Sequence, residues 1–152
     1  TRTQGLKLTA SLQMKLREDS YFSLPLIDVL PRGLSSNAAL AQWLSIRNPQ
    51  LAKFTADYAI PIYIGDIPLG GGFAYIKRMV LNPHFDYMEI GNKSLNSVGT
   101  ELLFDLNTTV WIEWPCSIGV SLSYNGGPSF REFSRDYLVQ RWHAGPTFNV
   151  TF

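Results

Sequence analysis

The sequence predicts an all-β fold, an antiparallel sheet of about six long strands, and three observations support this. Apolar and polar residues alternate along five segments, and successive side chains of a strand point to opposite faces. Charged residues make up only 16% of the 152 residues, against about 25% in an average soluble protein. Hydrophobic residues still reach 45%, so the chain can bury a core and is not expected to be disordered.

The five alternating segments are expected strands with one apolar and one polar face. They cover residues 6–16, 54–64, 97–107, 116–125 and 147–152. The clearest is 116–125, where apolar residues at even positions (Cys116, Ile118, Val120, Leu122, Tyr124) alternate with small polar ones (Ser117, Gly119, Ser121, Ser123, Asn125). A sixth strand is expected within 73–90, with a bend or an edge position at Pro83, because proline cannot donate a ladder hydrogen bond.

Two architectures fit these strands. In a soluble sandwich or barrel the apolar faces point inward, whereas in a transmembrane barrel they meet lipid and the polar faces line the lumen. Segments of about 10–11 residues favour the membrane barrel, because soluble strands have a mode near 5–6 residues. The residues expected to face the lumen are Glu101, Asp105, Ser117, Ser121 and Ser123. The predicted fold is therefore an antiparallel transmembrane β-barrel, or the carboxyl-terminal portion of one, forming a single domain over 1–152.

The connections are expected to separate by length between the two ends of the strands. If the last strand ends on the periplasmic side, segments 17–52, 91–94 and 126–142 lie outside, and 65–72 and 108–115 lie inside. The segment 17–52 should contain a short helix capped by Ser36 or Asn37, and it is either an external loop or a plug. Aromatic residues expected in an interfacial girdle are Trp111, Trp114 and Tyr124.

Composition and motifs argue against several function classes. The 13 basic residues are balanced by 12 acidic ones, which does not suit a nucleic-acid-binding protein. A single cysteine, Cys116, excludes an internal disulfide or a cysteine-rich zinc site, and His84 and His143 lack metal-ligand spacing. The sequence contains no run of 18 apolar residues, so no membrane-spanning helix is predicted. We therefore expect no metal, no cofactor and no nucleic-acid partner.

No catalytic constellation stands out either. Glu101 and Asp105 lie roughly 13 Å apart on one strand, too far for a glycosidase pair. The glycines 70–72 lack the Lys-Ser/Thr sequence of a phosphate-binding loop and predict a turn. Lys77 and Arg78 are expected to pair with a carboxylate across the lumen, with lipid head groups as the alternative partner. An enzymatic activity is therefore not expected.

Several short motifs taken together resemble a known family. They are Pro61-Ile62-Tyr63, Gly65-Asp66, Tyr75-Ile76-Lys77-Arg78, Phe85-Asp86-Tyr87, Val98-Gly99-Thr100-Glu101-Leu102, Ile118-Gly119-Val120 with Tyr124, and a carboxyl-terminal Phe. This order resembles the end of outer-membrane β-barrel proteins from Bacteroidota over about two thirds of the chain.

The resemblance implies a bacterial outer-membrane location and a last strand that signals assembly. Residues matching that signal are Gly145, Phe148, Val150 and Phe152. The implied partners are the lipid bilayer with lipopolysaccharide, the barrel-assembly machinery, and other outer-membrane subunits or lipoproteins. The implied function is a membrane-embedded scaffold or passage. The alternatives are a soluble β-barrel that binds a small apolar ligand and an outer-membrane barrel enzyme.

Six strands are fewer than the eight that a closed spanning barrel normally needs. Either the chain is part of a longer barrel, or strands lie undetected within 17–52 or 126–142, or several chains share one barrel. The first option is favoured, because the chain enters a strand soon after Thr1 and no secretory signal precedes it.

Overall fold

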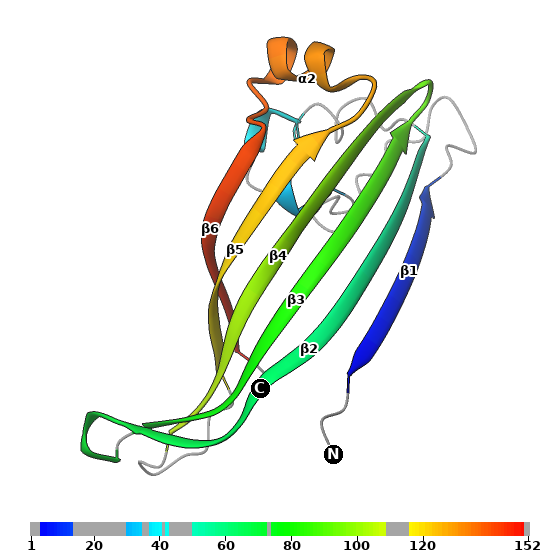
Figure 1. Cartoon of the computed structure of the whole chain (residues 1–152). Coiled ribbons are helices and arrows are strands. Elements are labelled where there is room, and N and C mark those ends of the chain that lie inside the picture. Colours follow the sequence, from blue (N-terminus) through cyan, green and yellow to red (C-terminus); the bar gives the residue numbers. More distant parts are fainter. Residues whose placement is uncertain are drawn as a thin grey trace.

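The computed structural model describes residues 4–13, 30–34, 37–40, 42, 50–72, 74–108 and 116–150. Within this part of the chain, six strands form one antiparallel meander in which each strand pairs with the next (Figure 1). The strands are β1 (Gly5–Gln13), β2 (Leu51–Leu69), β3 (Ala74–Ile90), β4 (Lys93–Thr108), β5 (Cys116–Gly126) and β6 (Trp142–Val150). The predicted antiparallel all-β fold is confirmed. The sheet is open, because β1 and β6 do not pair with each other.

Short helices accompany the sheet. The helix α2 (Phe130–Tyr137) connects β5 to β6, and the 3-10 turns η2 (Arg32–Leu34) and η3 (Gly70–Gly72) precede and follow β2. Residues 38–40 are helical, and Asn37 Oδ1 accepts a hydrogen bond of 2.9 Å from the Leu40 N–H. Asn37 is therefore the cap of the helix predicted in the first long connection. No helix among the described residues is long and apolar enough to cross a membrane.

The meander places alternate connections at opposite ends of the sheet. The β1–β2, β3–β4 and β5–β6 connections lie at one end, which we call the α2 end. The β2–β3 and β4–β5 connections lie at the other, the hairpin end (Figure 1). This is the division expected from the sequence. The β3–β4 turn is tight, and Gly91 (φ 59°) supplies the left-handed conformation that it requires.

Several details differ from the sequence prediction. β4 begins at Lys93 and β6 at Trp142, earlier than the alternating segments 97–107 and 147–152. β2 runs on to Leu69, so most of the predicted inner connection 65–72 is strand. The reason is irregular pairing with β3 between Pro61 and Tyr63 and again between Ile64 and Ile67, which breaks the alternation without ending the strand. Pro83 also lies in a central strand and not at an edge. Pairing of β2 with β3 is interrupted between Asp57 and Ile60, next to Pro83. The ladder therefore does not require a backbone N–H from the proline, which has none.

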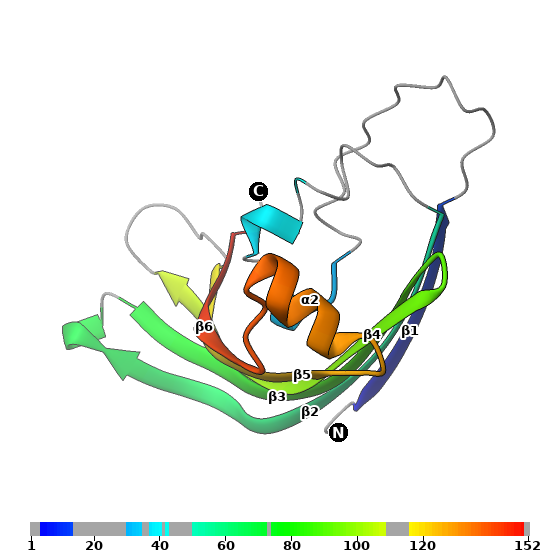
Figure 2. The ribbon, with the colours of Figure 1, turned by 90° about the horizontal axis from the view of Figure 1, so that it is seen from above.

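The sheet is curved, and its two faces differ in chemistry. Figure 2 shows α2 and η2 on the concave side. The strand register gathers apolar residues from all six strands on the convex side, and one row across the sheet contains Leu8, Ala56, Phe85, Val98, Tyr124 and Trp142. Many of these side chains are exposed, including Val120 (58%) and Phe148 (70%).

The buried core lies on the concave side at the α2 end. It combines residues of β2, β3 and β4 with residues of the first long connection and of the α2 region: Leu30, Leu34, Leu40, Leu51, Met88, Ile90, Leu95, Phe130, Phe133 and Val139. Apolar packing thus holds two connections against one end of the concave face. The rest of that face is polar, and the candidate site lies there.

Candidate functional site

The centre of the concave face holds one arginine surrounded by carboxylates. Arg32 donates to Asp86 through its backbone N–H (2.8 Å to Oδ2) and through Nη2 (3.1 Å to Oδ1). Nη2 also forms an ion pair with Asp57, and Nη1 lies 3.9 Å from Glu101 Oε2. The carboxylates come from β2, β3 and β4, whereas Arg32 comes from the connection between β1 and β2. We call these four residues the Arg32 cluster.

Burial makes this cluster energetically important. Asp86 is fully buried, and the Arg32 side chain is 27% exposed. Burial lowers the pKa of the Arg32 guanidinium, but the hydrogen bonds and charges of Asp86 and Asp57 outweigh it and raise the pKa above its ordinary value. Arg32 therefore remains charged and compensates a carboxylate that has no access to solvent.

A second set of hydrogen bonds anchors the same connection. Asn125 Nδ2 donates to the carbonyls of Gly33 and Gln140, both at 2.9 Å. A Cβ atom on Gly33 would press on Asn125 Oδ1 and lie 2.7 Å from Ser97 Oγ, so only glycine fits here. Lys53 Nζ also donates to the Leu30 carbonyl at 2.8 Å. We call residues 30–34 and 37–40 the inward segment, because these contacts hold it against the concave face.

A buried histidine lies beside the Arg32 cluster. His84 Nε2 is 3.4 Å from Ser123 Oγ, and both residues are buried. The histidine lies against Gly99, where a Cβ would come within 2.8 Å of His84 Nε2 and of Ser123 Oγ. In the part of the chain that the structure describes, no group of three His, Cys, Asp or Glu side chains could hold a metal ion. The arrangement is that of a packed polar interior.

All five residues expected to face a lumen lie on the concave face. Asp105 accepts hydrogen bonds from Arg78 Nε (2.6 Å) and from Ser117 Oγ (2.7 Å). Ser121 Oγ donates to the Gly145 carbonyl at 3.2 Å, and Ser123 contacts His84. Glu101 thus lies near Arg32, whereas Asp105 pairs with Arg78. Arg78 pairs with Asp105, its direct neighbour on the adjacent strand β4, and the expected pairing of Lys77 and Arg78 across a lumen stays a prediction.

Of the three residues predicted for the aromatic girdle, the structure describes Tyr124. Tyr124 lies at the α2 end, where its ring meets Trp142 edge-on at 5.0 Å between centroids. Trp111 and Trp114, the other two residues of the predicted girdle, lie outside the described residues.

The residues of the proposed assembly signal follow the alternation of β6. Phe148 is exposed on the convex face, and Gly145 lies on the concave face opposite Ser121. Val150 is the last residue of β6 and pairs with Cys116. Phe152 lies outside the described residues.

A groove on the concave face separates the Arg32 cluster from the hairpin end. Its volume is about 500 Å³, and charged side chains stand at both of its ends: Arg32 and Asp57 at one, Arg78 and Asp105 at the other. Lys7 of β1 lies along its side. The sheet therefore presents a charged path on its inner face and an apolar surface on its outer face.

No family model, curated protein or solved structure matches this chain. The functional argument therefore rests on the geometry of the two faces.

Proposed function

We propose that this chain is the carboxyl-terminal portion of an outer-membrane β-barrel that serves as a membrane-embedded scaffold or passage without catalytic chemistry of its own. The observation that carries the proposal is the strand register. Away from the core at the α2 end, each of the six strands carries apolar residues on the convex face, and many of them are exposed. A soluble monomer rarely exposes an apolar patch larger than a few hundred Å².

The height of the apolar band fits a bilayer. On β4 the convex positions from Val98 to Leu106 are apolar except for Thr100. Eight residue steps at about 3.4 Å span roughly 27 Å along the strand. With a strand tilt of about 40°, the band is roughly 20 Å tall, close to the apolar band of about 25 Å in outer-membrane barrels.

The polar side chains of the concave face favour its assignment to an enclosed lumen. Its buried charges are compensated within the Arg32 cluster, as a water-poor interior requires. Between the two roles considered for the connection 17–52, the contacts of the inward segment favour the plug. The curvature weighs against a soluble barrel with an apolar ligand inside, because the face that such a ligand would meet carries Asp86, Ser123 and Asn125.

The free edges of β1 and β6 indicate that the complete barrel has more than these six strands. An unpaired strand edge cannot face hydrocarbon, because its N–H and C=O groups find no water there. β1 and β6 therefore need further strands, which we assign to the remainder of a longer barrel. On this proposal β6 acts as the signal read by the assembly machinery, through alternating apolar residues such as Phe148 and a pairing-competent edge.

The proposal is tested by reconstitution of the full chain, and of any longer natural form, into phospholipid vesicles. We expect the protein to float with the vesicles, to resist alkaline extraction and to migrate differently on gels before and after heating. A protein that stays soluble and monodisperse without detergent, and does not float, contradicts the proposal.

A further inference from the structure

A second groove is lined by residues of β2 to β5 near the hairpin end of the sheet. Figure 1 shows that the β2–β3 hairpin bends away there. The volume of the groove is about 940 Å³, at the upper end of the range for small-ligand sites. Both charged and apolar residues line it: Asp66, Lys77, Arg78 and Asp105, with Ile64 and Leu106. We call it the hairpin-end groove.

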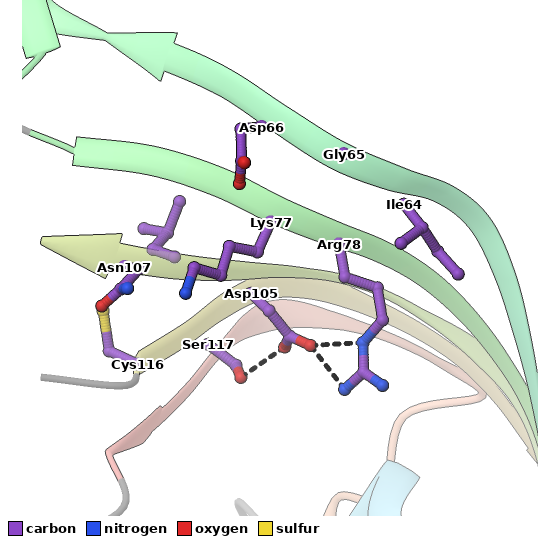
Figure 3. Close-up of a pocket in the computed structure, with 10 residues that line it drawn as sticks. Ile64, Gly65, Asp66, Lys77, Arg78, Asp105, Asn107, Cys116 and Ser117 are labelled. Atoms are coloured by element: carbon purple, nitrogen blue, oxygen red, sulfur yellow. Dashed lines mark hydrogen bonds and ion pairs between the residues drawn. The ribbon is translucent and has the colours of Figure 1, made fainter. Parts of the chain in front are cut away.

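A bulge in β3 aims two cations into this groove. Neighbouring residues of a regular strand point to opposite faces. Ile76 pairs with Leu106 and Arg78 with Asp105, so Lys77 is an extra residue without a partner on β4. Lys77 and Arg78, neighbours at this bulge, both line the groove (Figure 3).

The two cations differ in how they are held. Arg78 Nε and Nη2 both contact Asp105 Oδ2 at 2.6 Å, and Asp105 Oδ1 accepts from Ser117 Oγ (Figure 3). The guanidinium is therefore oriented by a fixed carboxylate, with a further N–H edge left over. Lys77 is exposed and forms no ion pair with any described residue. A fixed donor and an unpaired cation side by side suit a phosphate group.

The charge balance and the position of the groove further restrict the chemical class of ligand that would fit it. Its two cations and two carboxylates sum to zero, which favours a zwitterion over a simple anion. Leu106 and Cys116 also line it, and by register both belong to the apolar convex face. The hairpin-end groove thus joins the charged inner face to the surface that we assign to lipid.

We propose that the hairpin-end groove binds a zwitterionic phospholipid head group of the phosphoethanolamine kind. Lys77 and Arg78 bind the phosphate, Asp66 accepts from the ammonium group, and the acyl chains leave past Leu106 toward the apolar face. The inference rests on the proposed membrane function, because only a membrane-embedded sheet meets such lipids.

Native mass spectrometry of the detergent-solubilised chain tests this with added phosphatidylethanolamine, phosphatidylcholine and phosphatidylglycerol. We expect tightest binding of phosphatidylethanolamine and about fivefold weaker binding in Lys77→Gln. Asp66→Asn should remove the preference for phosphatidylethanolamine over phosphatidylglycerol. Lys93→Gln, which removes a lysine at the α2 end, is the matched control and should bind as the unmodified chain does.

Equal lipid binding by the unmodified chain, Lys77→Gln and Arg78→Gln overturns the site, and a wild-type preference for phosphatidylglycerol overturns the zwitterion. Full displacement of the lipid by inorganic phosphate shows a site for free phosphate and overturns the lipid assignment. Vesicle flotation distinguishes failure of this lipid site from failure of the proposed membrane function. If the chain floats but the variants bind lipid as the unmodified chain does, only the lipid site is refuted. If the chain does not float, both the lipid site and the membrane function are refuted.

Discussion

Replacement of Arg32 by alanine is expected to lower the free energy of unfolding by about 3–5 kcal/mol, because it leaves the fully buried Asp86 without its counter-charge. The same change removes the partner of Asp57 and the nearest cation to Glu101. The inward segment should then lose its central attachment to the sheet. Denaturant unfolding of the detergent-solubilised protein measures the effect.

Three companion variants isolate the charge from the packing. Arg32→Ala combined with Asp86→Asn should recover part of the stability, because the uncompensated charge is gone. Arg32→Lys should recover little, since an ammonium group cannot reproduce the planar guanidinium contacts with Asp86 and Asp57. Arg135→Ala, on an exposed side of α2, should change stability by less than about 0.5 kcal/mol. Unchanged unfolding of Arg32→Ala would show that the Arg32 cluster does not stabilise the fold.

Lysine substitutions at two neighbouring positions of β5 should have opposite outcomes. Val120→Lys places a charge in the middle of the convex apolar band and should cost about 2–4 kcal/mol of insertion free energy. Ser121→Lys places the same charge on the concave face opposite Glu101, and insertion should be close to that of the unmodified chain. The readout is the fraction of heat-modifiable, vesicle-embedded protein as a function of urea concentration.

Val120→Lys and Ser121→Lys also show whether lipid or water covers the convex face. If water covers that face, Val120→Lys is harmless, because the side chain is already 58% exposed. Ser121→Lys then becomes the more damaging change, since Ser121 is half-buried and bonded to Gly145. Equal insertion of both variants would contradict the membrane assignment.

Regular alternation made β5 predictable, whereas bulges concealed the true extent of β2. Residues 116–125 alternate without interruption, and the strand observed is Cys116–Gly126. In β2 the irregular pairing beyond Pro61 shifts the apolar positions from one face to the other, so a period of two no longer marks the strand. The same effect separates Lys77 from Arg78, since only Arg78 has a partner on β4 and pairs with Asp105.

The Arg32 cluster was not predicted, because its members are distant in sequence. Arg32 and Asp86 are 54 residues apart, and Arg32 lies in a connection without periodicity. A signal was nevertheless present. Asp57, Asp86 and Glu101 stand at polar-face positions within long strands, and such carboxylates need a cation wherever the face is enclosed. Arg32 is followed by Gly33, the residue that close backbone approach to a sheet requires.

The central claim is that the convex apolar face meets lipid, and a cysteine scan along β5 tests it most directly. In a Cys116→Ala background, single cysteines at 117–125 are labelled with an environment-sensitive fluorophore and exposed to nitroxide-bearing lipids in vesicles. We expect strong quenching at Ile118, Val120 and Leu122 and weak quenching at Ser117, Ser121 and Ser123, in strict alternation. Alternation of the opposite phase, or weak lipid quenching at every position, would contradict the assignment of this face to the membrane.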